Sequence, residues 1–158
     1  MGHLEVGEKA PDFALPSQSK GIIRLSDYFG KKNVVLYFYP KDFTPGCTAE
    51  TKAFRESYQS FYDSDTEVIG VSSDSVETHQ RFSQQCELPF NILSDATKQV
   101  RDLYGANSML GMSGRVTFVI DKEGVIRSVF SSQLQPTRHV REVLEAVNAG
   151  KSKAPKAI

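Results

Sequence analysis

The sequence has no excess of either charge and very little cysteine. Nineteen basic side chains balance nineteen acidic ones over 158 residues, so no long-range field favours binding to a nucleic acid or an anionic membrane. The two cysteines, Cys47 and Cys86, are too few for a disulfide framework or a cysteine-rich zinc site. We therefore expect no nucleic-acid or membrane partner, and a reducing compartment in which any disulfide is transient.

Long hydrophobic segments are absent as well. The longest apolar run, residues 34–39, is far shorter than the ~20 residues that span a bilayer. The first six residues show no cationic region followed by an apolar stretch, so no secretory signal is visible. We expect a cytoplasmic protein, or an organellar one whose transit peptide has been removed. The length fits one domain, residues 1–158, with a mobile basic tail at 151–158.

An apolar run at residues 33–39 leads, through a short loop, into a predicted helix that begins at a cysteine. Residues 33–39 have the near-continuous hydrophobicity of a strand covered on both faces. After Pro40 and a short loop, a helical period begins at Cys47. At about 100° per residue, the core positions Phe54 and Phe61 share one stripe with this cysteine. The thiol is thus expected on the packed face of the helix, in its first turn.

The remaining pattern predicts alternating strands and helices. Short strands flank a turn at residues 20–21, and Asp95 and Ser75 are candidate helix caps. Further segments are strands at 67–72, 89–93, 115–120 and 125–130, helices at 75–86, 96–104 and 136–150, and a loop at 107–114. This order predicts an α/β fold: a mixed sheet with helices on both faces and an N-terminal hairpin.

A reactive thiol needs a device that favours the thiolate. Helix N-termini and neighbouring cations lower the pKa of a cysteine. Arg115 is the candidate cation, because it opens an apolar strand and its charge is permanent; the alternative is a surface arginine. Thr44 can donate to a bound oxygen, and Pro40 would shield the thiolate from water. The alternative for Cys47 is a small buried hydrophobe. The Thr-Pro-Gly that precedes it argues against this alternative.

These residues resemble a known family. Pro40-x-x-x-Thr44-x-x-Cys47 resembles the peroxiredoxin active-site motif, and the string YPKDFTPGCT at 39–48 looks like the Q subfamily, also called bacterioferritin comigratory proteins. The match extends over roughly residues 4–147. Its flanking signatures are Gly7-x-x-Ala10-Pro11-Asp12-Phe13, Phe54-Arg55, Pro89-Phe90, Leu93-Ser94-Asp95 and Gly114-Arg115.

The resemblance implies a thioredoxin-like fold and a cofactor-free thiol peroxidase, and we expect the protein to be a monomer. Such an enzyme reduces hydrogen peroxide and organic hydroperoxides through a sulfenic acid, with thioredoxin or another thiol as reductant. By this analogy Cys47 is the peroxidatic cysteine, Arg115 holds it as thiolate, and Thr44 and Pro40 complete the pocket. The alternative is a peroxide-sensing or chaperone-like redox protein on the same fold. A disulfide oxidoreductase is disfavoured because the sequence has no C-x-x-C.

The sequence departs from the Q pattern at the second thiol. Many members carry a resolving cysteine where this chain has Lys52. Cys86 is either the resolving cysteine or a core residue beside Phe82. A disulfide needs Cα atoms within ~7 Å, so a bridge would require local unfolding. His79 on the same helix face is expected at the surface. Glu50 either orients Arg115 or Thr44, or favours the helix N-terminus.

Overall fold

The apolar run at residues 33–39 forms the central strand of a five-stranded sheet. The computed structural model describes residues 4–19, 21–106, 115–131 and 136–153. The strand order is β5-β4-β3-β6-β7, with β3, β4 and β5 parallel and β6 and β7 antiparallel to their neighbours. The strands are β3 (Asn33–Phe38), β4 (Thr66–Ser72), β5 (Asn91–Ser94), β6 (Val116–Ile120) and β7 (Ile126–Ser131). The predicted mixed sheet is confirmed.

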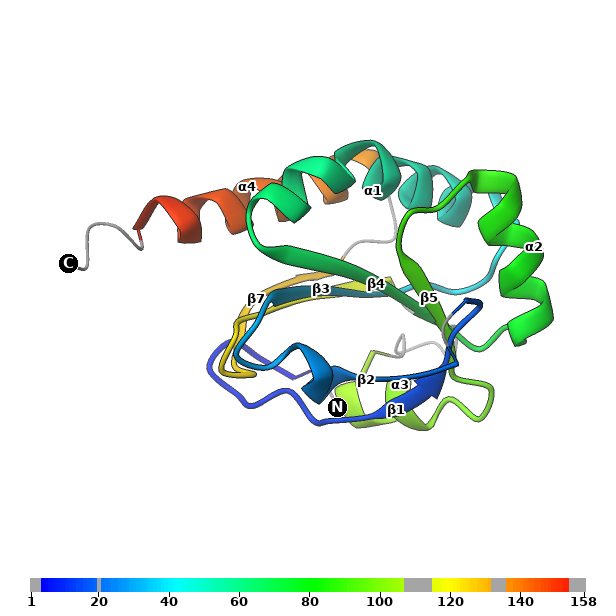
Figure 1. Cartoon of the computed structure of the whole chain (residues 1–158), viewed down its shortest axis with the longest axis horizontal. Helices are drawn as coiled ribbons and strands as arrows, with labels where there is room; N and C mark the ends of the chain where they lie inside the picture. Colours follow the sequence, from blue (N-terminus) through cyan, green and yellow to red (C-terminus); the bar gives the residue numbers. More distant parts are fainter. Residues whose placement is uncertain (1–3, 20, 107–114, 132–135, 154–158) are drawn as a thin grey trace.

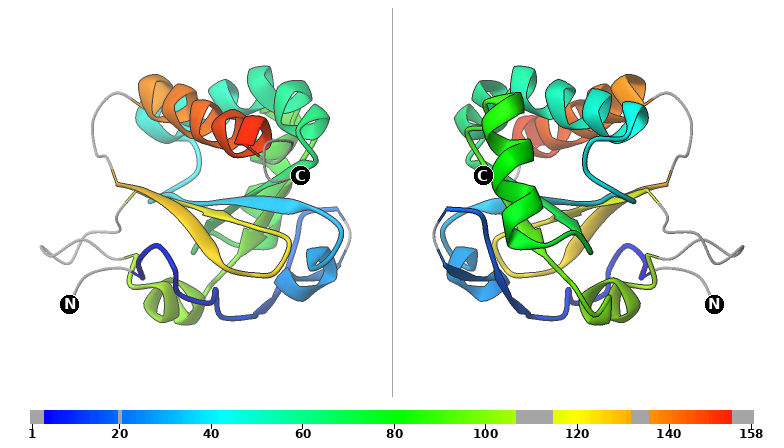
Figure 2. Two further views of the ribbon diagram at one scale, coloured as in Figure 1. Left: turned by 90° about the vertical axis from the view of Figure 1, so that its left-hand side faces the viewer. Right: turned by 90° about the vertical axis from the view of Figure 1, so that its right-hand side faces the viewer.

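Helices cover both faces of this sheet (Figures 1 and 2). One face carries the helices α1 (Pro45–Asp63), α2 (Val76–Cys86) and α4 (Pro136–Lys153). The other carries α3 (Gln99–Tyr104), the 3-10 helix η1 (Leu25–Tyr28), and the hairpin β1 (Ala14–Pro16) with β2 (Ile22–Arg24). Because side chains alternate along a strand, Tyr37 packs towards α1 and Phe38 towards α3. Two covered faces explain why β3 is apolar from Val34 to Phe38.

The strand register brings distant residues to one edge of the sheet. The parallel strands β3, β4 and β5 all end at the same edge. Because β6 is antiparallel to β3 and pairs Val116 with Phe38, β6 begins where β3 ends. Arg115, immediately before β6, therefore lies beside the chain that leaves β3 for Cys47.

Two helices differ from the expected boundaries. α3 begins at Gln99 rather than residue 96, because the Asp95 carboxylate accepts hydrogen bonds from the backbone N–H groups of Val100 and Arg101. α4 runs on to Lys153, so the start of the expected tail is helical. The rest of that tail, 154–158, and the predicted loop 107–114 lie outside the described residues. No helix among the described residues has both the length and the hydropathy to cross a membrane.

Candidate active site

Cys47 lies in the first turn of α1, as the sequence predicts. Thr44 is the N-cap, and Pro45 occupies the first helical position, where its fixed φ and missing N–H suit a helix start. Backbone N–H groups in this turn have no intrahelical partner and carry partial positive charge. The Cys47 side chain is almost fully buried, at 1% exposure. A buried sulfur therefore faces the positive end of a long helix.

Arg115 supplies a full positive charge at the same point. Its Nη2 lies 3.6 Å from the Cys47 Sγ, and its Nη1 donates to Glu50 Oε1 at 2.6 Å. Only 5% of Arg115 is exposed, so the alternative of a surface arginine is excluded. Residues three apart share a helix face, and α1 thus presents the thiol and the Glu50 carboxyl to one guanidinium. Of the three roles considered for Glu50, the structure shows the contact with Arg115.

Gly46 permits this close approach. A Cβ atom built on Gly46 would lie 3.1 Å from Arg115 Nη2, tighter than an ordinary van der Waals contact. A side chain at this position would require the guanidinium to shift by a few tenths of an ångström. The glycine before Cys47 thus favours the position of Arg115 beside the sulfur.

Burial and charge act in opposite directions on the pKa values of Glu50 and Arg115. Burial raises the pKa of Glu50 to about 7, although the charge and the hydrogen bond of Arg115 act to lower it. Burial also opposes the charge of Arg115, but Glu50 and Cys47 outweigh that effect and leave the arginine pKa above its ordinary value. Glu50 therefore changes protonation near neutral pH, three residues from the sulfur.

A second buried guanidinium, which the sequence analysis missed, lies close by. Arg101 on α3 is 1% exposed and donates to the carbonyl groups of Tyr39 at 2.6 Å and Ala106 at 2.9 Å. Burial lowers the pKa of Arg101, while Asp95 and Cys47 act to raise it. A charged residue between the apolar Val100 and Tyr104 was the available sequence signal.

Pro40 and Thr44 bound the loop between β3 and α1, and both are partly buried. The Thr44 hydroxyl donates to the Lys41 carbonyl at 2.9 Å. Between them, Phe43 has a positive φ of 67°, a conformation that costs a non-glycine residue roughly 1 kcal/mol. Its ring makes an edge contact with Phe82 of α2, with centroids 5.1 Å apart. The active-site loop is thus held in a strained form against α2.

Cys86 is the last residue of α2 and is 1% exposed. It belongs to the same hydrophobic cluster as Phe82 and Cys47, which agrees with the core alternative. Both thiols are free. Burial raises the pKa of Cys86, although Lys52 and Arg55 act to lower it. Whether Cys86 also resolves an oxidised Cys47 stays a prediction.

The expectation for His79 was wrong. This side chain is completely buried, with Nδ1 at 2.5 Å from Asp42 Oδ2 and Nε2 at 2.9 Å from the Leu93 carbonyl oxygen. Burial is tolerated because both ring nitrogens have protein partners. The face that His79 shares with Phe82 and Cys86 was the signal that should have placed it inside.

The fold and this site together define a class of protein. A strand of a thioredoxin-like sheet leads into a helix whose first turn holds a thiol against a buried arginine. This arrangement favours the thiolate, the form in which cysteine acts as a nucleophile in enzymes.

Comparison with known proteins identifies the family. The model of the AhpC/TSA family matches residues 6–129. Peroxiredoxin Q of Sedum lineare, a chloroplastic protein by its name, is 43% identical over 145 residues, which cover 90% of this chain and 77% of that protein. The chain therefore belongs to the AhpC/TSA family, in the peroxiredoxin Q group, and is a thiol-dependent peroxidase.

Solved structures agree with this assignment. Peroxidoxin BcpB from Mycobacterium tuberculosis superposes with a TM-score of 0.86 at 33% identity, over 93% of this chain and 98% of that one. Peroxiredoxin Q from Xanthomonas campestris gives a TM-score of 0.84 at 28% identity, over 94% and 97% of the two chains. The thioredoxin-like fold expected from the sequence is confirmed, and the peroxidase reading is favoured over the sensor or chaperone-like alternative.

Proposed function

We propose that Cys47 is the peroxidatic nucleophile and that Arg115, Thr44 and Pro40 form its pocket. The observation that carries the proposal is the 3.6 Å contact between the Cys47 Sγ and Arg115 Nη2 at the start of α1. A guanidinium and a helix N-terminus both favour the anionic form of a thiol. The site therefore supports a thiolate ready to attack a hydroperoxide.

The first step oxidises the sulfur by two electrons. The Cys47 thiolate attacks one peroxide oxygen, a new S–O bond forms, and the O–O bond breaks. The other oxygen leaves as hydroxide or alkoxide and takes a proton from water, which gives water or an alcohol. Arg115 stabilises the departing negative charge, an oxyanion-type contribution. The Thr44 hydroxyl donates to the same substrate when it turns away from the Lys41 carbonyl. Cys47 becomes a sulfenic acid.

The second step returns the sulfur to the thiol. A thiol condenses with the sulfenic acid to form a disulfide and release water. We propose Cys86 as that thiol, although its buried position at the end of α2 requires a local opening before the sulfur atoms meet. A thioredoxin-type dithiol then reduces the disulfide. Without Cys86 the external thiol takes both roles.

Peroxide consumption by the purified chain with thioredoxin and its reductase tests the assignment of Cys47. The isosteric variant Cys47→Ser is expected to consume no hydrogen peroxide above background, because a hydroxyl at this pH is not a comparable nucleophile. Cys86→Ser is the matched control, and its first turnover with peroxide should match the wild type. Sustained consumption by Cys47→Ser would overturn the proposal.

Intact mass after one equivalent of peroxide, without reductant, tests the role of Cys86. An internal disulfide lowers the mass by about 2 Da, whereas a sulfenic acid raises it by about 16 Da. We expect the loss in the wild type and the gain in Cys86→Ser. A gain in both would assign resolution to an external thiol.

We also propose that the enzyme is monomeric and works in a reducing compartment. The balanced charge gives no reason for a nucleic-acid or membrane partner. The chloroplastic name of the Sedum relative makes an organelle the alternative to the cytoplasm. Light scattering of the reduced protein tests the monomer, and fractionation of the source cells tests the compartment.

A further inference from the structure

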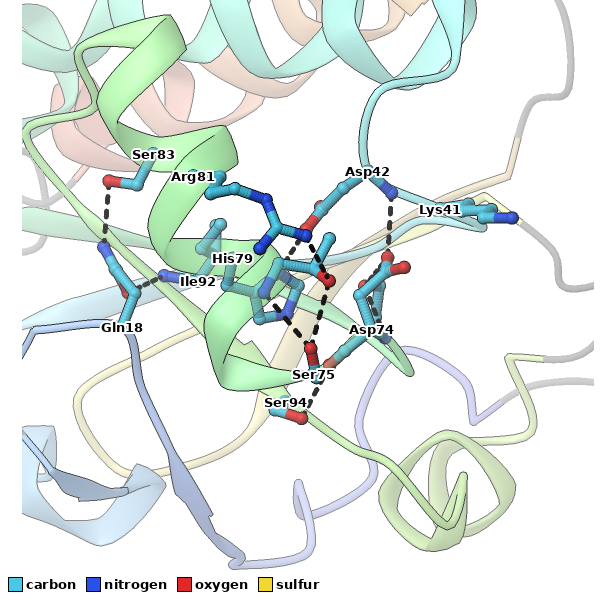
Figure 3. Close-up of polar contacts among 12 residues, drawn as sticks. Gln18, Lys41, Asp42, Asp74, Ser75, His79, Arg81, Ser83, Ile92 and Ser94 are labelled. Carbon is cyan, nitrogen blue, oxygen red and sulfur yellow. Dashed lines mark hydrogen bonds and ion pairs between the residues drawn. The ribbon is translucent and has the colours of Figure 1, made fainter.

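A buried polar network lies beneath the active-site loop, and the reaction described above assigns it no part (Figure 3). Asp42 is 2% exposed. Its carboxyl accepts from the Tyr39 hydroxyl at 2.5 Å and meets His79 Nδ1 at 2.5 Å. Its backbone N–H donates to Asp74 Oδ2 at 2.8 Å. Asp42 is thus tied to the residue after β3, to α2 and to the segment after β4 at once.

His79 carries this network across to β5. Its Nε2 faces the Leu93 carbonyl at 2.9 Å, and because a carbonyl only accepts, Nε2 bears a hydrogen. The remaining ring nitrogen shares one proton with Asp42, as an imidazolium–carboxylate or an imidazole–carboxylic acid contact. Asp42, Asp74 and His79 have the composition of a metal site, but both nitrogens of His79 already have protein partners. The three side chains therefore hold the loop in place and do not form a cation site.

This polar network acts on the loop that leads from β3 to Cys47. Asp42 lies between Pro40 and Thr44, immediately before Phe43 with its positive φ of 67°. A strained residue persists only where its surroundings hold it. The side chain of Asp42 on one side of Phe43 and the N-cap Thr44 on the other provide that hold.

We propose that His79 and Asp42 are positioning residues of the peroxidase reaction. His79 holds the Asp42 carboxyl, Asp42 fixes the loop, and the loop places Thr44 relative to the substrate that Cys47 attacks. This inference rests on the proposed function. It predicts that breaking the Asp42–His79 contact slows reaction with peroxide while leaving the thiolate itself, set by Arg115 and α1, largely as it was.

Two variants of His79 separate this role from simple packing. Asparagine places a polar group near Nδ1 and keeps a hydrogen bond to Asp42, whereas glutamine places one near Nε2 and keeps the bond to Leu93. We expect His79→Gln to lower the rate of Cys47 oxidation by hydrogen peroxide by roughly 10- to 100-fold, as small misplacements do, and His79→Asn to stay within about threefold of the wild type.

Alkylation by iodoacetamide supplies the readout that a merely structural role would not give. Alkylation needs the thiolate but not the peroxide geometry. We expect Cys47 alkylation in His79→Gln to stay within about twofold of the wild type while its peroxide rate falls. Equal peroxide rates in His79→Asn and His79→Gln, or a parallel change of both reactions, would overturn the proposal.

Asp42 gives a second pair should His79→Gln fail to fold. Asp42→Asn still accepts from Tyr39 and donates to a neutral His79, and should remain within about threefold of the wild type, whereas Asp42→Ala should lose roughly 10-fold or more. Equal rates would again overturn the inference. The wild type and Cys47→Ser are run alongside: peroxide consumption by Cys47→Ser would mean that the proposed function, rather than this inference, has failed.

Discussion

The two cysteines have the same exposure and opposite surroundings. Cys47 and Cys86 are each 1% exposed and lie in one hydrophobic cluster. Cys47 stands at the start of α1 with Arg115 Nη2 at 3.6 Å. Cys86 stands at the end of α2, where partial negative charge gathers, and burial raises its pKa. Burial alone therefore disfavours the thiolate, and a fixed cation with a helix start is what distinguishes a candidate nucleophile.

Removing the Arg115 guanidinium should remove most of the difference in reactivity between Cys47 and Cys86. We expect Arg115→Ala to slow oxidation of Cys47 by hydrogen peroxide by about 100- to 1000-fold, the usual cost of losing a donor that stabilises developing charge. Arg115→Lys should be intermediate, because lysine keeps the charge without the planar pair of donors. The measurement is competition for peroxide against a haem peroxidase of known rate.

The control for this prediction is Arg127→Ala. Arg127 is an exposed arginine of β7 paired with Asp121, so its loss should leave the rate within about twofold. A wild-type rate in Arg115→Ala would show that the helix start alone activates Cys47. The contrast with Cys86 would then rest on helix ends and not on the arginine.

Ionisation of the buried Glu50 lowers the free energy of unfolding as the pH rises. Its pKa is 4.5 in a free chain and about 7 in the fold, so the folded state binds the proton more tightly. Stability from this group is complete below about pH 4.5 and is lost as the pH rises through 7, by at most about 3 kcal/mol. In Glu50→Gln, the fall in unfolding free energy between pH 5 and pH 8 should shrink by that order.

Urea unfolding at the two pH values provides the measurement. Glu56→Gln on the exposed side of α1 is the matched control and should keep the wild-type difference. An unchanged pH dependence in Glu50→Gln would mean that Arg115 keeps the carboxyl ionised throughout. At every pH the charge of Arg115 beside Cys47 would then be offset by an ionised Glu50.

The local part of the site could be predicted from the sequence, because it depends on near neighbours. The apolar run into Pro40, the Thr-Pro-Gly before Cys47 and the period of α1 each report the conformation of a few consecutive residues. Arg115 was placed by its strand start and by the family motif. Its distance from Cys47 depends on the Phe38–Val116 pairing, which no local pattern encodes.

The buried polar residues could not be predicted in the same way. His79 and Arg101 are polar residues whose burial depends on partners far along the chain: Asp42 and Leu93 for the first, Tyr39 for the second. A single sequence shows the polarity of such residues but not their partners, so the surface is the default expectation. The signal available for each was a polar residue among apolar neighbours on a helix face.

The smallest expected effect concerns the hold on Cys86. The Arg55 guanidinium reaches from α1 and donates to the Cys86 carbonyl at 2.7 Å, which secures the last turn of α2. Loss of a hydrogen bond from a charged donor costs about 1.5 kcal/mol or more, so Arg55→Ala should open this turn and speed alkylation of Cys86 by about tenfold. Mass spectrometry of iodoacetamide-labelled peptides measures both cysteines in one sample.

Lys52→Ala is the control that separates charge from anchoring. Lys52 is an exposed cation of α1 that also favours the Cys86 thiolate, but no hydrogen bond to Cys86 is recorded for it among the described residues. Its loss should slow Cys86 alkylation slightly, by less than about twofold, and so in the direction opposite to Arg55→Ala. If both variants slow the reaction, the two cations control Cys86 through its thiolate, and the hydrogen bond from Arg55 does not protect it. Cys86 would then differ from Cys47 in its cation contacts and not in access.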